Sequence, residues 1–130
     1  MNTHRAQKEN SYQAQLKKRI KERFKHAIVA KMNPNDIQGI PDLVVLFKNH
    51  WALLETKRDP QASKRPNQDF YVDFYNNWSF AAFINPENEE EVLNAMEQSF
   101  SAPWSAFVFI PVLTPMATLW SREAYKDILE

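Results

Sequence analysis

The apolar residues in the first half of the chain predict a helix followed by a hairpin. Leu16, Ile20 and Phe24 recur every four residues, a pattern typical of a helix with one buried face. Two apolar runs follow, at residues 43–47 and 51–54, and the polar residues 48–50 separate them. Apolar runs joined by a short polar segment are typical of a β-hairpin.

The second half of the chain predicts a further helix, strand and helix. Residues 68–78 have helical periodicity, residues 79–84 form an apolar run typical of a buried strand, and residues 85–87 begin another helix. The three glutamates at 89–91 are expected to favour the positive end of that helix, and we do not interpret them as ligands.

The chain is expected to divide into a core, residues 1–100, and an apolar C-terminal extension, residues 101–130. The extension would pack on the core or form a dimer contact, with a strand at 106–110 and a short helix at 122–129. Prolines at 103, 111 and 115 interrupt its apolar runs. No stretch reaches the roughly 20 apolar residues that a membrane helix needs, so no membrane partner is expected.

The hairpin turn decides which side chains meet at the open end of the hairpin. A turn at Asn49-His50 would place Lys57 opposite Asp42 and Glu55 opposite Val44. Opposite residues share a face of the sheet, as do residues two apart on one strand. Asp42, Glu55 and Lys57 would then converge on one side, whereas a loop of odd length would separate the two carboxylates.

Two carboxylates beside an amine suit metal-assisted hydrolysis of a phosphodiester. Hard oxygen ligands favour Mg²⁺ or Mn²⁺ over zinc, and such an ion can activate a water while the lysine orients it or stabilises the developing charge. Pro41-Asp42 alone is an ordinary turn dipeptide, and Glu-x-Lys alone is an ordinary ion pair. Their combination at hairpin distance, after the chain's single glycine at position 39, favours the functional interpretation.

The order of these motifs resembles that of a known nuclease superfamily. Gly39-Ile40-Pro41-Asp42, the hairpin, Glu55-Thr56-Lys57 and a helix bearing Gln68 and Tyr71 resemble the PD-(D/E)XK nucleases, most closely the stand-alone VRR-NUC-type nucleases of phages and bacteria. The resemblance covers roughly residues 9–100. It implies an α/β fold in which helices flank a central mixed β-sheet, in the order α-β-β-β-α-β-α.

The resemblance also implies an activity and assigns residues to it. It implies a Mg²⁺-dependent (or Mn²⁺-dependent) DNA endonuclease that is a homodimer and cuts branched DNA, such as the Holliday junctions of DNA recombination. Asp42 and Glu55 would be metal ligands with the Thr56 carbonyl as a third, and Lys57 would be the catalytic lysine. Gln68 and Tyr71 match family residues that contact the active site or the DNA backbone.

One position departs from the family pattern. Relatives carry a metal-binding glutamate on the first helix, in a stretch resembling Gln-Ala-Glu-Leu, whereas this chain reads Gln13-Ala14-Gln15-Leu16. Gln15 would therefore bring a neutral amide to the metal site and weaken ion binding or turnover. Either Glu9 or Glu22 is a candidate to compensate, although Glu22 lies about 10 Å further along the helix.

The charge distribution favours a nucleic-acid partner, although the net charge is zero. Residues 1–31 carry nine Lys/Arg against two acids, and residues 67–130 carry two against ten. A basic stripe on the first helix can neutralise phosphates, and the alternative is a solvated helix surface. The expected DNA contacts are Lys17, Lys18, Lys21, Lys25, Lys31, Arg58, Lys64 and Arg65.

Composition excludes several other classes of protein. The absence of cysteine excludes disulfides and cysteine-based zinc sites, and the three histidines have no ligand spacing. No glycine-rich phosphate loop is found, so no nucleotide cofactor is expected. The basic N-terminus is not followed by an apolar signal segment, so we expect a cytoplasmic location, in the bacterial host if the chain is phage-encoded.

Two further functions remain open at this point. One is a site-specific or end-processing DNA endonuclease. The other is a DNA-binding module that keeps the nuclease fold but is silenced by Gln15. A metal titration of the Gln15→Glu variant would separate an enzyme from a silent module.

Overall fold

The computed structural model describes residues 3–58, 61 and 66–101. The described elements up to Phe100 belong to one compact unit. The elements are α1 (Thr3–Arg23), β1 (Ile28–Lys31), β2 (Leu43–Phe47), β3 (His50–Thr56), α2 (Pro66–Asn76), β4 (Phe80–Ile84) and α3 (Glu89–Ser101). This order confirms the predicted α-β-β-β-α-β-α arrangement. The strand and helix predicted at 106–110 and 122–129 lie outside the described residues.

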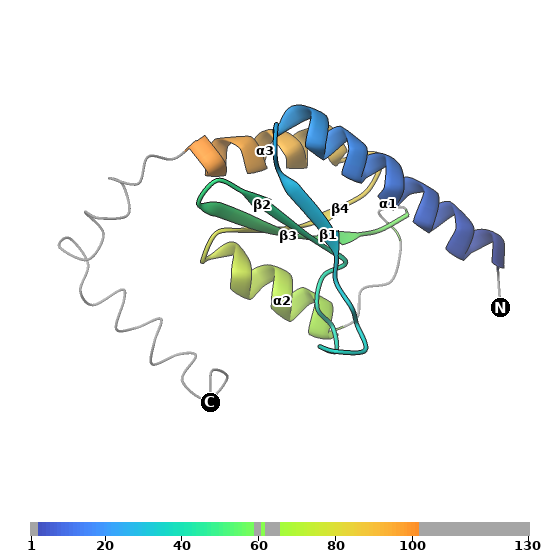
Figure 1. The fold of residues 1–130 in the computed structure, drawn as a ribbon. Helices are drawn as coiled ribbons and strands as arrows, with labels where there is room; N and C mark the ends of the chain where they lie inside the picture. Colours follow the sequence, from blue (N-terminus) through green and yellow to red (C-terminus); the bar gives the residue numbers. More distant parts are fainter. Residues whose placement is uncertain (1–2, 59–60, 62–65, 102–130) are drawn as a thin grey trace, which may run out of the picture. The chain divides into compact units, whose positions relative to one another are not determined.

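The four strands form one mixed sheet, as predicted. The strand order is β1-β2-β3-β4, with antiparallel pairs β1–β2 and β2–β3 and a parallel pair β3–β4. Helix α2 makes the connection between the two parallel strands. Helices α1 and α3 lie on one face of the sheet and α2 lies on the other, so the sheet is the middle layer (Figure 1).

The hairpin register differs from the prediction by two residues. Phe47 pairs with His50 and Val44 pairs with Leu53, so the turn is Lys48-Asn49 and the predicted pairing of Glu55 with Val44 is wrong. Lys48 has a φ of 55°, and two-residue hairpin turns require a positive φ at their first central residue. The shift is an even number of residues, so it leaves every side chain on its predicted face.

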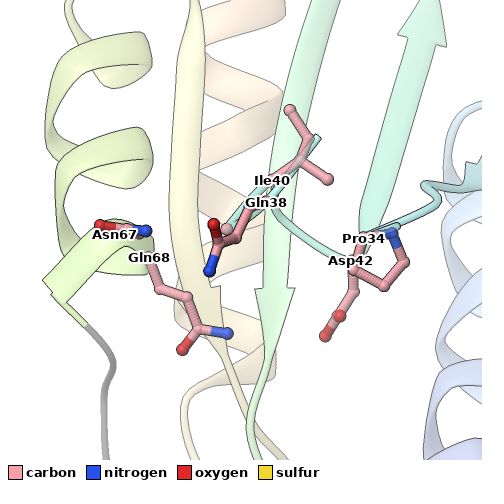
Figure 2. A pocket seen from close by; sticks show the side chains of 7 residues that line it. Pro34, Gln38, Ile40, Asp42, Asn67 and Gln68 are labelled. Carbon is pink, nitrogen blue, oxygen red and sulfur yellow. The ribbon is translucent and has the colours of Figure 1, made fainter. Parts of the chain in front are cut away.

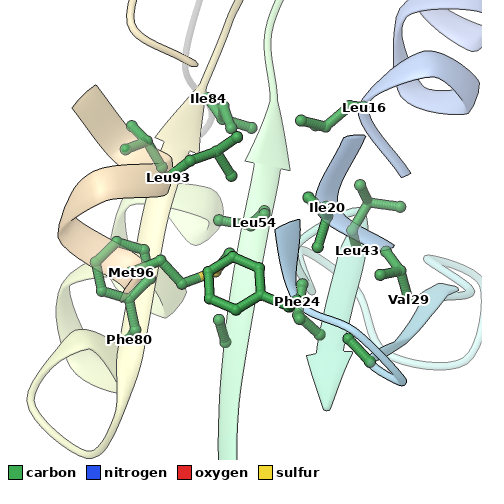
Figure 3. Packing of buried hydrophobic residues seen from close by; sticks show 14 of the residues in the cluster. Leu16, Ile20, Phe24, Val29, Leu43, Leu54, Phe80, Ile84, Leu93 and Met96 are labelled. Carbon is green, nitrogen blue, oxygen red and sulfur yellow. The ribbon is translucent and has the colours of Figure 1, made fainter. Parts of the chain in front are cut away.

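The main core lies between the sheet and helices α1 and α3. Leu16 and Ile20 of α1, and Phe24 directly after the helix, are almost fully buried, as their spacing predicts. They pack with Met96 of α3 over Leu54 of the central strand β3 (Figure 3). Burying a large aliphatic or aromatic side chain contributes about 1.5–3 kcal/mol, so this layer fixes α1 across the strand ends that carry the site.

Ion pairs join the outer surfaces of α1 and α3. Arg19 donates to both carboxylate oxygens of Glu89, at 2.5 and 2.9 Å, and Tyr12 Oη donates to the same group at 3.1 Å. Burial, together with the Glu89 charge, raises the pKa of Tyr12. Arg23 pairs with Glu97 at 2.7 Å. Glu89, at the start of α3, therefore also holds the two helices together.

None of the described helices is both long and apolar enough to cross a membrane.

Candidate active site

The site forms where β2 begins and β3 ends, because the antiparallel pairing brings these two points together. Asp42 directly precedes β2, and Glu55 and Thr56 are the last residues of β3. The Thr56 N–H and Oγ1 both donate to Asp42 Oδ2, at 3.1 and 2.5 Å. Within the described part of the chain, Asp42 Oδ1 carries no hydrogen bond, so one oxygen of this carboxylate is fixed and the other is available.

Glu55 is the most unusual group in the site. Alternation along β3 directs its side chain to the α2 face, where only 2% of the residue is exposed. Gln68 Nε2 donates to Glu55 Oε1, and Lys57 Nζ lies 3.4 Å from the same oxygen. The second oxygen, Oε2, is buried and has no hydrogen-bond partner among the described residues. A buried carboxylate oxygen left unpaired is costly, which indicates a site built for a further ligand.

The protonation of Glu55 points to a cation as that ligand. Burial and, to a smaller extent, the Asp42 charge together raise its pKa to about 7, although Lys57 acts in the opposite direction. A divalent cation between the two carboxylates would favour the charged form and satisfy Oε2. The described residues contain no group of three or more His, Cys, Asp or Glu side chains placed so that they could hold a metal ion. The other ligands of such an ion would therefore be water or neutral oxygens, which suits Mg²⁺.

Lys57 is held by the first turn of α2. Lys57 Nζ donates to Gln68 Oε1 at 2.7 Å, and the same amide donates through Nε2 to Glu55. Gln68 thus bridges the lysine and the buried carboxylate. The sequence predicted that Asp42, Glu55 and Lys57 would converge, and the structure places them with Gln68 at one end of the hairpin.

Helix α1 reaches the site through Gln13, whereas Gln15 is exposed to solvent. Gln13 is 7% exposed, and its Nε2 donates to Thr56 Oγ1 at 2.7 Å. Residues two positions apart in a helix are about 200° apart around its axis, so Gln13 and Gln15 cannot face the same site. The prediction that Gln15 reaches the candidate metal site is therefore wrong. The glutamine of α1 that reaches this site is Gln13. The signal was present in the sequence, because Gln13 is three residues before Leu16 and shares its inward face.

Tyr71 lies beside the hydrogen-bonded network and contacts other aromatic rings. Its ring is stacked on that of Tyr75, with centroids 5.8 Å apart, and meets the edge of Phe70. It also lies under the loop at Gly39, where an added Cβ would be 3.5 Å from Tyr71 Cε2. The structure thus places Tyr71 as support for the loop that leads into Asp42.

The basic residues of α1 divide into two groups. Arg19 and Arg23 are engaged by acids of α3, whereas Lys18, Lys21 and Lys25 are exposed. Three more of the predicted DNA-contacting side chains are partly or fully exposed, namely Lys17, Lys31 and Arg58. The last two, Lys64 and Arg65, lie outside the described residues.

A pocket of about 310 Å³ adjoins this site. It lies between the loop before β2 and the start of α2, and Asp42 and Gln68 belong to its wall (Figure 2). Gly39 has a φ of 83°, and a Cβ there would stand 2.6 Å from Asn67 Cβ. The loop can approach α2 this closely because position 39 lacks a side chain.

Comparison with solved structures finds a similar backbone in a chain described as a VRR_NUC domain. The TM-score is 0.48 at 21% sequence identity, and the match covers 62% of this chain and 92% of the other. No protein-family model matches the chain, and no curated protein matches it.

Proposed function

We propose that this protein is a DNA endonuclease that hydrolyses phosphodiester bonds with Mg²⁺ or Mn²⁺. The observation that carries the proposal is the buried, unpartnered Oε2 of Glu55, beside a second carboxylate and a lysine. A site that served only as an internal ion pair would satisfy both oxygens of its buried carboxylate.

Asp42 and Glu55 are the residues that would hold the ion, with the Thr56 carbonyl as a third oxygen. When bound, the ion would neutralise charge on the scissile phosphate and lower the pKa of a water molecule. Thr56 holds one oxygen of Asp42 in place through its two donated hydrogen bonds, so the other oxygen would be the one offered to the ion.

Lys57 would act on the phosphate or on the attacking water. Its side chain is 13% exposed and its ammonium is held by Gln68, so it would add positive charge at a defined point as charge develops on the phosphate oxygens. A lysine in this place costs no reorganisation during the reaction, because Gln68 already orients it. Tyr71 would support the same region through the loop at Gly39.

Branched DNA, such as a Holliday junction, is the substrate that we favour. The exposed lysines of α1 supply positive charge for phosphate contact, and the motif resemblance suggests a junction-cutting homodimer. A two-fold dimer would bring two such sites to two strands of a junction. The protein would then act in DNA recombination, in the cytoplasm of a bacterium or of a phage-infected host.

The test is a cleavage assay on a labelled four-way junction, a linear duplex and a single strand of related sequence, with Mg²⁺ and with Mn²⁺. The parent is compared with Asp42→Ala and with Asp36→Ala, which removes an exposed acid in the preceding loop. We expect junction cleavage by the parent and by Asp36→Ala, and none by Asp42→Ala. Equal cleavage by all three would refute the site, and faster cutting of the linear duplex would favour the site-specific or end-processing enzyme.

One observation supports a second candidate, a DNA-binding module without turnover. Helix α1 brings the neutral amide of Gln13 to the site, and no third carboxylate joins Asp42 and Glu55 within the described residues. DNA binding by the parent without cutting under either metal would favour this module over the enzyme.

A further inference from the structure

The pocket beside Asp42 is lined by Asp42 and Gln68 of the proposed catalytic site and by five further residues to which the proposed hydrolysis gives no direct role. Its described walls are formed by Pro34, Gln38, Gly39, Ile40, Asp42, Asn67 and Gln68. None of these residues is cationic, and the single charge is the carboxylate of Asp42. A phosphate group would be repelled by that carboxylate, so the pocket is unsuited to a second phosphate.

The polar groups of the pocket are side-chain amides. The amide of Gln68 is already committed to Lys57 and Glu55. The amides of Gln38 and Asn67 are exposed and make no hydrogen bond to another described residue. Each amide offers both donors and an acceptor, which is the pattern needed to meet the edge of a nucleobase.

The apolar part of the pocket complements this pattern. Pro34 and Ile40 supply apolar surface beside the amides, and the close-up shows Asn67 and Gln68 on the α2 side with Pro34 and Asp42 on the opposite side (Figure 2). Small-molecule sites combine apolar walls with a few placed polar groups, and this pocket offers apolar and polar surface in nearly equal parts. A volume of about 310 Å³ lies at the lower end of the range of small-molecule pockets, which suits one base.

We propose that this pocket receives one unpaired nucleobase of the DNA, next to the scissile phosphate. The inference rests on the proposed function and narrows its substrate class. A base stacked in a duplex cannot enter a pocket unless it leaves the stack, which costs a few kcal/mol and least where the base is already unpaired. The preferred DNA would therefore carry an unpaired or splayed nucleotide at the cut, as a branch point does.

The conformation of Gly39 shapes the loop before Asp42 and also the pocket. Its positive φ and missing side chain bring the loop against Asn67, so that Gln38 from the loop and Asn67 from α2 line the same cavity. The two amides come from segments that are far apart in the chain. A base between them would tie the loop that carries Asp42 to the helix that carries Gln68.

The test is a double-mutant cycle in which a base is removed from the DNA and a side-chain amide is removed from the protein, separately and together. The cleavage site on the junction is mapped first, and single abasic nucleotides are then placed at successive positions on either side of it. The parent, Gln38→Ala, Asn67→Ala and the control Gln98→Ala, an exposed amide on α3, are compared. Cleavage rate with Mn²⁺ and DNA affinity without divalent cation are measured for every pair.

We expect one abasic position to weaken the parent and the Gln98→Ala control about tenfold, in rate or in affinity, as the loss of a paired set of base contacts would. Gln38→Ala or Asn67→Ala should be weakened by a similar factor on intact DNA and should show little further loss on the abasic DNA.

Two results would overturn the proposal. If the parent cuts DNA and the losses from the abasic site and from the pocket variants simply multiply, the pocket does not hold the base, and the proposed function stands. If the parent neither binds nor cuts any of the DNAs, both the pocket and the proposed function fail.

Discussion

Gln13 and Thr56 are joined by a 2.7 Å hydrogen bond across 43 residues of sequence. Thr56 Oγ1 in turn donates a hydrogen bond to Asp42 Oδ2. Helix α1 is therefore connected to the candidate metal ligand Asp42 through two successive hydrogen bonds. On the other side of the hairpin, Gln68 of α2 holds Glu55 and Lys57. One glutamine from each helix thus positions the charged groups at the open end of the hairpin.

The position of Gln13 predicts which helix variant changes metal affinity. Gln13→Glu would add a carboxylate beside Asp42, so we expect tighter Mn²⁺ binding and, without metal, lower stability because like charges repel. Gln15→Glu is the matched control, since Gln15 is exposed and should leave both properties unchanged. Titration calorimetry and thermal unfolding with and without Mn²⁺ measure the two effects. A gain with Gln15→Glu but not with Gln13→Glu would contradict the structure.

The raised pKa of Glu55 predicts a specific pH dependence of stability in the metal-free protein. The folded pKa is about 7 against an ordinary value of 4.5. The folded state therefore keeps a proton that the unfolded state releases, and the stabilisation present below pH 4.5 is lost as pH rises to about 7. The loss corresponds to about 3 kcal/mol.

Denaturant unfolding between pH 5 and pH 8, in the presence of a chelator, measures this effect. We expect Glu55→Gln to remove most of the decline, because the amide does not ionise. Glu91→Gln, which changes an exposed acid on α3, should keep it. An unchanged slope in Glu55→Gln would show that Glu55 titrates at an ordinary pKa.

The bond between Lys57 and Gln68 predicts a catalytic effect without a binding effect. Gln68→Ala removes the 2.7 Å acceptor of the ammonium, so we expect the cleavage rate to fall about tenfold or more through lost positioning. DNA affinity should stay within about threefold, because few phosphate contacts are lost. Asn77→Ala, which removes an exposed amide directly after the end of α2, should change neither. A Gln68→Ala enzyme with full cleavage rate would contradict the positioning role.

The two groups of basic residues on α1 should respond differently to substitution. Lys18 and Lys21 are exposed, so their joint replacement by alanine should weaken DNA binding and reduce the salt slope of log Kd by roughly 2. Arg19 is bound by Glu89, so Arg19→Ala should lower the free energy of unfolding by about 1 kcal/mol with a smaller effect on DNA binding. Filter binding across a salt series and urea unfolding separate the two. Equal salt slopes for the Lys18/Lys21 variant and the parent would exclude this helix from the DNA contact.

The fold could be predicted from the sequence because its local patterns agree with its tertiary packing. The four-residue spacing of Leu16 and Ile20 on α1 and the two apolar runs of the hairpin each have one plausible buried face. The face shared by Asp42 and Glu55 could be predicted as well, since it depends only on whether the loop length is even or odd.

The hairpin turn, the roles of the two glutamines and the pocket could not be predicted from the sequence. Each depends on tertiary packing or on an unusual backbone conformation, which a short sequence pattern does not show. The turn at Lys48-Asn49 uses a positive φ in a lysine, where a glycine or asparagine would have been the usual signal. The roles of Gln13 and Gln68 depend on how the helices lie across the sheet, which the core packing determines. The pocket depends on the contact between Gly39 and α2, which appears only when residues far apart in the chain are brought together.

The most direct test of the central claim is calorimetric titration of Mn²⁺ into the parent, Glu55→Gln and the control Glu91→Gln at pH 7.5. If Glu55 and Asp42 form the ion site, the parent and the control bind the ion with equal affinity and Glu55→Gln binds it at least about tenfold more weakly, as the loss of a charged ligand requires. Equal binding by all three, or no binding by the parent, would contradict the account.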